Sequence, residues 1–148
     1  MSTIPVKIKK LRPNSVIPFH GSSAAAGYDA YACLDLCVEI PPHETRKIPT
    51  GIAVEIPDGY MMGVFARSGL ATKKGLRPSN CVGVIDSDYR GEVIVALYND
   101  SDSTQYVFNK DKVAQLIILP FYYWDIQEVE ELSDTTRGAG GFGSTDGK

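Results

Sequence analysis

The stretch Asn80–Val95, NCVGVIDSDYRGEVIV, decides how the rest of the chain is interpreted. Its apolar runs Cys81–Ile85 and Val93–Val95 flank the polar segment Asp86–Gly91. Two β-prone runs around a short loop with a glycine near its end are typical of a β-hairpin. This stretch therefore predicts two paired strands joined by a polar tip.

The polar segment carries more chemistry than a turn requires. Turn geometry favours Gly, Asn or Asp, but it gives no reason for an adjacent aromatic and base, Tyr89 and Arg90. A carboxylate at a strand end, such as that of Asp86, can act as a base against a flat ligand when a rigid ring lies beside it. A solvated hairpin tip is the alternative that this loop alone leaves open.

Outward from this loop the chain divides into many short strands. Frequent Pro and Gly and almost no helical periodicity predict an all-β sandwich or barrel, a single domain over residues 1–132. Ser68–Gly75 is the best candidate for a short helix, with Ser68 as its N-cap. The expected strands are Pro5–Leu11, Leu34–Ile40, Glu44–Ile48, Ile52–Ile56, Tyr60–Ala66, Thr104–Phe108 and Val113–Phe121, with Gly27–Asp29 as an interruption and Tyr122–Val129 continuing or forming a last strand.

Composition narrows the class of protein. With 148 residues and 43% hydrophobic content, the chain can bury one real core. A net charge of −3 argues against a nucleic-acid partner, and no apolar run reaches membrane-spanning length. Three cysteines without C-x-x-C spacing, and no signal-peptide pattern, favour reduced thiols in a cytoplasmic or nuclear protein over a disulfide frame or a zinc site.

The character of the chain changes at Ser133. Residues 133–148, SDTTRGAGGFGSTDGK, are rich in Gly and small polar residues, which predicts a flexible arm. Its glycines satisfy G-x-G-x-x-G, but no strand-then-helix context follows, so a dinucleotide site is rejected. Backbone N–H groups and Arg137 can still grip phosphate oxygens, and Phe142 can cover a flat ligand. A disordered tail without function is the alternative.

Three further signals are weak one by one. Helix N-termini favour anions, so Arg67-Ser68-Gly69 can bind a phosphate or simply begin a helix. Gln115 lies in an apolar run, and its amide can bond a phosphate or only the backbone. Asp29 can reach metal-bound water or be only a turn residue.

The order of these signals along the chain is specific, and it resembles the homotrimeric dUTP pyrophosphatase (dUTPase) family. The five motifs of that family occur in sequence and span nearly the whole chain. Ala66 stands where Pro often precedes Arg-Ser, and Asp146 where Gly often follows Ser-Thr. The motifs are AGYDAYA (Ala26–Ala32), RSGLA (Arg67–Ala71), GVIDSDYRGEV (Gly83–Val93), KDKVAQLI (Lys110–Ile117) and RGAGGFGST (Arg137–Thr145).

The resemblance implies a jelly-roll-like β fold, a homotrimer and three active sites at subunit interfaces. It also implies hydrolysis of dUTP to dUMP and pyrophosphate, which limits uracil incorporation into DNA and supplies dUMP for dTMP synthesis. Mg²⁺ would be held mainly by the substrate phosphates and water, since the motifs supply few acids for an all-protein cage. Asp29 would reach this ion only through water.

The resemblance further assigns roles to single residues. Asp86 would orient and deprotonate the water that attacks the α-phosphorus, and Tyr89 would pack on the deoxyribose and exclude a ribose. The backbone from Asn80 to Tyr89, including Gly83, Val84 and Ile85, would read the uracil edge. Ser68, Gly69 and Gln115 would hold phosphates, and Arg67 would have a phosphate-site or structural role. On an arm from a neighbouring subunit, Arg137 and Ser144 or Thr145 would close over the γ-phosphate, Gly143 would contact the substrate, and Phe142 would cover the base.

Two rival interpretations remain open. A dCTP deaminase has a similar fold, but it would need a glutamate poised over the base and usually lacks the Asp-x-x-Tyr hairpin with the Phe-containing arm. A jelly-roll module that binds nucleotides without turnover is the rival outside enzymes. Asp86, Arg137 and Phe142 argue against this second rival.

Overall fold

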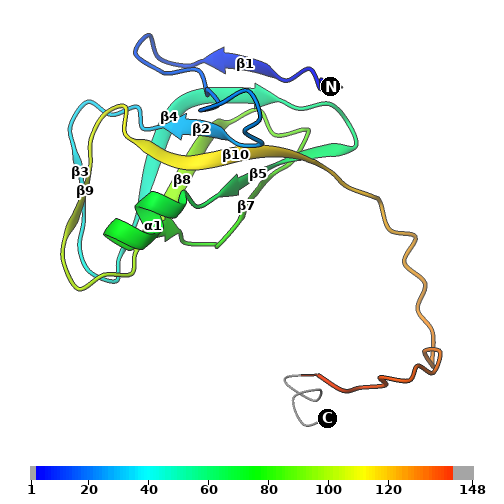
Figure 1. The fold of residues 1–148 in the computed structure, drawn as a ribbon. Coiled ribbons are helices and arrows are strands. Elements are labelled where there is room, and N and C mark those ends of the chain that lie inside the picture. Colours follow the sequence, from blue (N-terminus) through cyan, green and yellow to red (C-terminus); the bar gives the residue numbers. More distant parts are fainter. Residues whose placement is uncertain (1–2, 142–148) are drawn as a thin grey trace.

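Three antiparallel sheets make up the computed structural model, which describes residues 3–141 (Figure 1). The strand orders are β1-β4-β8-β6, β2-β10-β5-β7 and β3-β9. The elements are β1 Lys7–Lys10, β2 Tyr28–Tyr31, β3 Val38–Ile40, β4 Thr45–Glu55, β5 Tyr60–Phe65, α1 Ser68–Lys74, β6 Leu76–Pro78, β7 Gly83–Ile85, β8 Glu92–Asn99, β9 Gln105–Val107 and β10 Lys112–Pro120.

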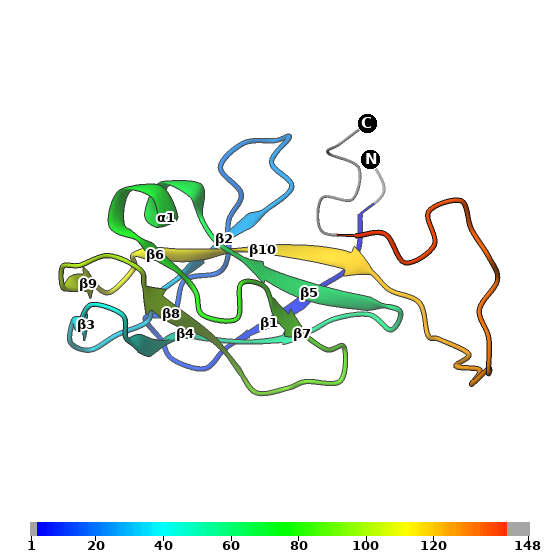
Figure 2. The ribbon, with the colours of Figure 1, turned by 90° about the horizontal axis from the view of Figure 1, so that it is seen from below.

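The two four-stranded sheets lie in two layers over one buried core (Figure 2). β8 shows why: Val93, Val95 and Leu97 are at most 1% exposed, whereas Ile94 between them is 46% exposed. A period of two places one face of a strand in the core and the other in solvent. The predicted all-β, jelly-roll-like fold is confirmed.

The predicted hairpin at Asp86–Gly91 is wrong in its pairing. β7 pairs with β5, and β8 pairs with β4 and β6, so the two strands belong to different sheets. Their inward residues, Ile85 on β7 and Val93 on β8, join the same core cluster from opposite layers. The loop therefore crosses from one sheet to the other. Alternation predicted which residues face the core, but it does not specify the hydrogen-bonding partner of a strand.

Two of the expected strands are one. β4 runs unbroken over Thr45–Glu55, and its register with β8 shifts between Pro49 and Ala53. Gly51 lies at this shift with φ +69°, a left-handed conformation that glycine adopts without steric cost. A β-bulge, rather than a break in the strand, thus accommodates the Pro-Thr-Gly sequence.

The predicted strand Leu34–Ile40 is wrong over its first half. Only Val38–Ile40 forms a strand, and Leu36 is 83% exposed. Conversely, the predicted interruption at Gly27–Asp29 is wrong in part, since β2 begins at Tyr28. Tertiary pairing explains both differences: β2 pairs with β10, whereas residues 34–37 pair with no strand in the described chain.

The short helix is confirmed, but its cap is not Ser68. α1 begins at Ser68, and Arg67 is the N-cap residue, with extended backbone and no side-chain cap hydrogen bond. At the other end, Gly75 is left-handed and its N–H donates to the carbonyls of Ala71 and Leu70. This glycine C-cap ends the helix and directs the chain into β6.

The last predicted strand, Tyr122–Val129, is wrong for the single chain. From residue 121 to residue 141 the chain leaves the sandwich without regular structure, as both views show (Figures 1 and 2). Tyr122 is 86% exposed, Trp124 84% and Leu132 88%. Within residues 3–141, no helix is long and apolar enough to cross a membrane.

Candidate active site

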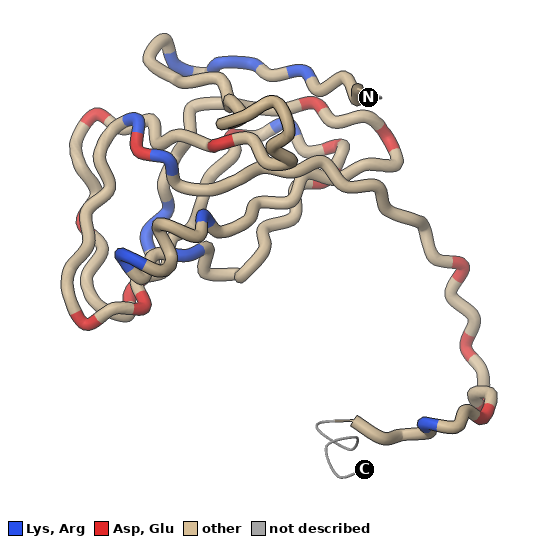
Figure 3. The backbone as a smooth tube through the Cα atoms, viewed as in Figure 1, with Lys and Arg blue, Asp and Glu red and all other residues tan. Residues whose placement is uncertain are grey.

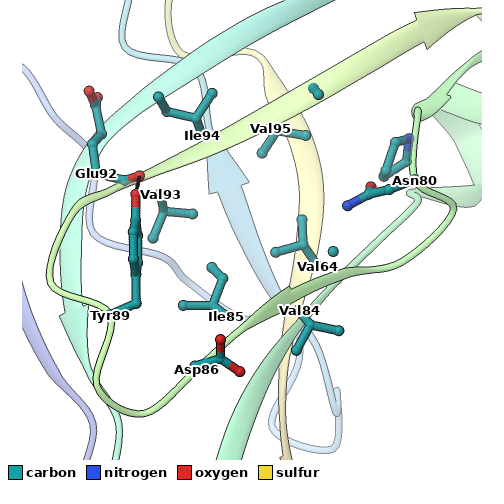
Figure 4. Close-up of a pocket in the computed structure, with 13 residues that line it drawn as sticks. Val64, Asn80, Val84, Ile85, Asp86, Tyr89, Glu92, Val93, Ile94 and Val95 are labelled. Carbon is teal, nitrogen blue, oxygen red and sulfur yellow. Dashed lines mark hydrogen bonds between the residues drawn. The ribbon is translucent and has the colours of Figure 1, made fainter.

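A cavity of about 250 Å³ opens between β7 and β8, at the loop that crosses the two sheets (Figure 4). Such a volume is slightly below the range of roughly 300–1,000 Å³ typical of small-molecule sites. Its lining combines apolar side chains with a few polar groups. They include Val64, Asn80, Ile85, Asp86, Tyr89, Glu92, Val93 and Val95.

The floor of this cavity is rigid and apolar. Ile85, Val93 and Val95 line it and are also members of the buried core cluster, so their positions are held by packing from both sheets. Gly83 has no side chain to block the space, and a Cβ there would lie 3.1 Å from Val64 Cβ. An apolar floor of this kind suits a ligand with a ring.

The polar wall comes from the crossing loop. Tyr89 N–H donates to the Asp86 carbonyl over 3.2 Å, which closes a turn between the two residues. The Tyr89 hydroxyl donates to the Glu92 carbonyl over 3.1 Å, and the ring stands beside the cavity (Figure 4). The Asp86 carboxylate and the Tyr89 ring therefore line one cavity, as the sequence motif led us to expect.

A second group of predicted residues gathers on β2, β5 and β10. Gln115 on β10 is paired with Asp29 on β2 and with Phe65, the last residue of β5. Arg67 follows Phe65 by two residues, so it lies close to β2 and β10. The Asp29 carboxylate is buried and binds two cations, Arg67 Nε at 3.0 Å and Lys112 Nζ at 2.8 Å. Arg67 also donates to the Lys112 carbonyl over 3.3 Å.

These contacts change the interpretation of Asp29. It is a strand residue rather than a turn residue, and each of its oxygens has a cationic partner. Asp29 raises the pKa of Lys112 through a hydrogen bond and its charge, which favours the protonated form of the lysine in this pair. Asp29 thus organises two cations at this end of the sheet.

The remaining residues of this group are accessible. Ser68 and Gly69 are exposed at the start of α1. Gln115 is half-buried and packs against Gly27, where an added Cβ would lie 3.3 Å from Gln115 Cβ. A glycine at this position leaves room for the amide side chain.

Positive charge concentrates beside this group, although the chain as a whole is negative (Figure 3). A second cavity of about 320 Å³ is lined by four cations and one acid. It includes Arg67 and Lys112, but neither Asp86 nor Tyr89. The other charged lining residues are Lys74, Lys110 and Asp111.

The described part of the arm, residues 133–141, lines neither cavity. Arg137 donates to the Gly140 carbonyl over 2.7 Å, a contact within the arm itself, and the arm leads away from the sheets (Figure 1). Phe142, Gly143, Ser144 and Thr145 lie outside the described residues. Their contacts with a ligand stay predictions.

The comparisons with known proteins agree on one family. A model of the dUTPase family matches residues 14–146. The deoxyuridine 5'-triphosphate nucleotidohydrolase of Desulfitobacterium hafniense (strain DSM 10664 / DCB-2) is 45% identical over 148 residues, covering 98% of each chain. The chain belongs to the dUTPase family. Solved structures of family members extend the likeness to three dimensions.

A Staphylococcus bacteriophage 80alpha dUTPase with dUpNHpp superposes with a TM-score of 0.87 at 27% identity, covering 97% of this chain and 99% of the other. A dUTPase from phage phi11 of S. aureus, described with a structural Mg(II) ion, has a TM-score of 0.78 at 26% identity and covers 88% and 99%.

Within this dUTPase chain the motif residues form two separate groups. Asn80, Asp86 and Tyr89 line the cavity between β7 and β8. Asp29 and Gln115 lie on β2 and β10 of the second sheet, and Arg67 follows β5 and binds Asp29. Arg137 belongs to neither group.

Sequence reasoning missed Gly91 and Glu92. Both lie in the third dUTPase motif, yet we assigned them no role. Glu92 lines the cavity, and its carboxylate accepts a hydrogen bond from Gly51 N–H over 2.7 Å. The only sequence signal was a charged residue at the start of an otherwise apolar strand.

We predict that Asp29→Asn lowers the free energy of unfolding by about 1–3 kcal/mol, because one carboxylate serves two partly exposed cations. Urea denaturation at fixed protein concentration would measure it. Glu55→Gln is the matched control, since it removes an exposed pair with Lys7 that solvent screens, and it should leave the free energy of unfolding nearly unchanged. Equal losses in the two variants would show that Asp29 has no special structural role.

Proposed function

We propose that this protein hydrolyses dUTP to dUMP and pyrophosphate. The observation that carries the proposal is the cavity in which the Asp86 carboxylate and the Tyr89 ring stand over an apolar floor. Membership of the dUTPase family and a relative named deoxyuridine 5'-triphosphate nucleotidohydrolase support the choice of substrate.

Asp86 acts as the general base. Its carboxylate accepts a proton from a water molecule as the water oxygen attacks the α-phosphorus. The bond from the α-phosphorus to the oxygen bridging to the β-phosphate breaks, and that oxygen leaves with pyrophosphate. Asp86 is exposed in the single chain, so this chemistry requires a cover that excludes bulk water.

The edge of the second sheet reads the uracil. β7 is the last strand in its sheet order, so the outward N–H and C=O groups of Gly83–Ile85 are free to bond a ligand. The Watson–Crick edge of uracil alternates acceptor and donor, like the edge of a strand. Tyr89 packs on the deoxyribose and Asn80 closes the opposite side of the cavity.

The triphosphate extends to Arg67, Ser68, Gly69 and Gln115 of a neighbouring copy. In one chain these residues do not line the cavity that holds Asp86, so a single subunit lacks a complete site. A homotrimer supplies each site from two or more subunits. The large exposed side chains after β10, including Tyr122 and Trp124, are of the kind that oligomers bury.

Magnesium fits this site as a companion of the substrate. In the described residues no group of three or more His, Cys, Asp and Glu side chains could hold a metal ion. Both oxygens of Asp29 bind cations, which leaves it at most a water-mediated contact with the ion. Bound to the triphosphate oxygens and water, Mg²⁺ would neutralise charge during the reaction.

The arm completes the site on another subunit. Arg137 and the hydroxyls of Ser144 and Thr145 close over the γ-phosphate, the backbone of Gly143 approaches it, and Phe142 covers the base. Figure 1 shows residues 121–141 extending away from the sandwich of their own chain. Closure of such a segment excludes water and commits the substrate.

We predict that Asp86→Asn lowers kcat with dUTP by at least ~10²-fold, the usual loss when a general base is removed. Binding of dUMP, measured by calorimetry, should be largely kept because the amide is isosteric. Asp88→Asn, two residues along the same loop and outside the cavity lining, is the control. Near-normal turnover of Asp86→Asn would refute the assignment of the base.

Deleting residues 137–148 should nearly abolish pyrophosphate release from dUTP while circular dichroism still reports the folded β core. The reason is that Arg137 and the residues that cover the base are lost together. A truncated protein with full activity would refute the role of the arm.

Sedimentation equilibrium should give about three times the chain mass of 16.1 kDa. A monomeric mass in an active preparation would contradict shared sites. The same preparation tests the rivals: ammonia release from dCTP would indicate a deaminase, and nucleotide binding without pyrophosphate release from dUTP would indicate a binding module.

A further inference from the structure

The Tyr89 ring lies directly over Gly91. A Cβ added to Gly91 would stand 2.6 Å from Tyr89 Cζ and 3.0 Å from Tyr89 Cε2. Both distances are shorter than a normal carbon–carbon contact of about 3.5–4.0 Å. Gly91 therefore has no side chain for a packing reason: any substituent would push the ring away from the loop.

The far end of the same ring is also held. Its hydroxyl donates to the Glu92 carbonyl over 3.1 Å, the one contact drawn as a dashed line in Figure 4. The ring thus folds back across its own loop, resting on Gly91 and bonded to Glu92. Two contacts with the chain immediately after Tyr89 fix where this wall of the cavity stands.

Glu92, the first residue of β8, is in turn tied to the neighbouring strand β4 of the same sheet. One carboxylate oxygen accepts the Gly51 N–H over 2.7 Å, and the other lies 3.9 Å from Arg12 Nη2. Gly51 itself is confined, since a Cβ there would lie 2.8 Å from Cys33 Sγ. The peptide that holds the Tyr89 hydroxyl is consequently anchored to the bulge in β4.

We propose that Gly91 and Glu92 are positioning residues for the Tyr89 wall, and that they set the selectivity of the site for deoxyribose over ribose. This inference rests on the proposed function, in which Tyr89 packs on the sugar. It goes beyond that function because the role given to both residues is to fix the position of the ring rather than to bind the substrate.

Selectivity of this kind is sensitive to small displacements. A pocket that must reject one added hydroxyl has only limited discrimination unless a rigid group occupies the space of that hydroxyl. A ring displaced by the size of a methyl group opens such a space, and misplacements of about 1 Å can change rates by ~10²-fold. The contacts that hold Tyr89 should therefore matter as much as Tyr89 itself.

The test compares kcat/KM for dUTP with kcat/KM for UTP in matched glycine variants. Gly91→Ala should lower the dUTP:UTP ratio at least ~10-fold, since the ring must move. Gly21→Ala is the control: it is also a glycine-to-alanine change, but nothing lies within 4 Å of the added Cβ. Its ratio should equal that of the unsubstituted protein.

A second pair tests the anchor. Glu92→Ala removes the acceptor for Gly51 N–H and should lower the dUTP:UTP ratio of kcat/KM. Glu92→Gln keeps an oxygen that can accept this hydrogen bond, so its ratio should be higher than that of Glu92→Ala. Tyr89→Phe keeps the ring but loses the bond to the Glu92 carbonyl, and its ratio should fall between Gly91→Ala and the unsubstituted protein. Calorimetry with dUMP and UMP provides a readout of the sugar site that does not depend on turnover.

The outcomes separate this inference from the proposed function. An unsubstituted protein that does not hydrolyse dUTP overturns both. If it hydrolyses dUTP selectively, and Gly91→Ala and Glu92→Ala match Gly21→Ala in rate ratio and in dUMP:UMP affinity ratio, the function stands and the inference fails. Should Gly91→Ala not fold, the Glu92 pair decides: equal ratios in Glu92→Ala and Glu92→Gln overturn the inference.

Discussion

The packing of β7 against β8 across the core is the constraint on which the site depends. Ile85 from one sheet and Val93 and Val95 from the other belong to a single buried cluster. Sheets packed face to face lie about 10 Å apart, so the loop between these strands must span the core rather than turn tightly. The crossing leaves a cavity at the rim, with a free strand edge on one side and the Tyr89 ring on the other.

The buried carboxylate of Asp29 is a second constraint, because it fixes the positions of two cationic side chains. It binds Arg67, just before α1, and Lys112, at the start of β10, so two cations of the second cavity are held by one buried acid. A protein with a net charge of −3 can in this way present a locally positive cavity to a polyanion. The separation of this cavity from the one holding Asp86 is the physical reason to propose a site shared between subunits.

The sequence predicted where most strands form, but it did not predict which strands pair with each other. The alternation in β8 and the apolar run of β10 predicted both strands, because a period of two reports burial directly. Leu36 and the Tyr122–Val129 segment were mispredicted for the converse reason: β-prone residues form a strand only where a neighbouring edge accepts their hydrogen bonds. The same limit concealed the link between Asp29 and Arg67, which are 38 positions apart.

By itself, the sequence determined the all-β class, the short helix ending at Gly75, and the set of chemical groups, since motif order and periodicity are properties of the chain alone. Only the tertiary structure decided that β7 and β8 lie in different sheets, that Asp29 binds two cations, and that Gly91 and Glu92 hold the Tyr89 ring. These facts depend on which backbone groups pair over long sequence distances and on how close packed atoms come to one another. Local residue patterns specify neither of these.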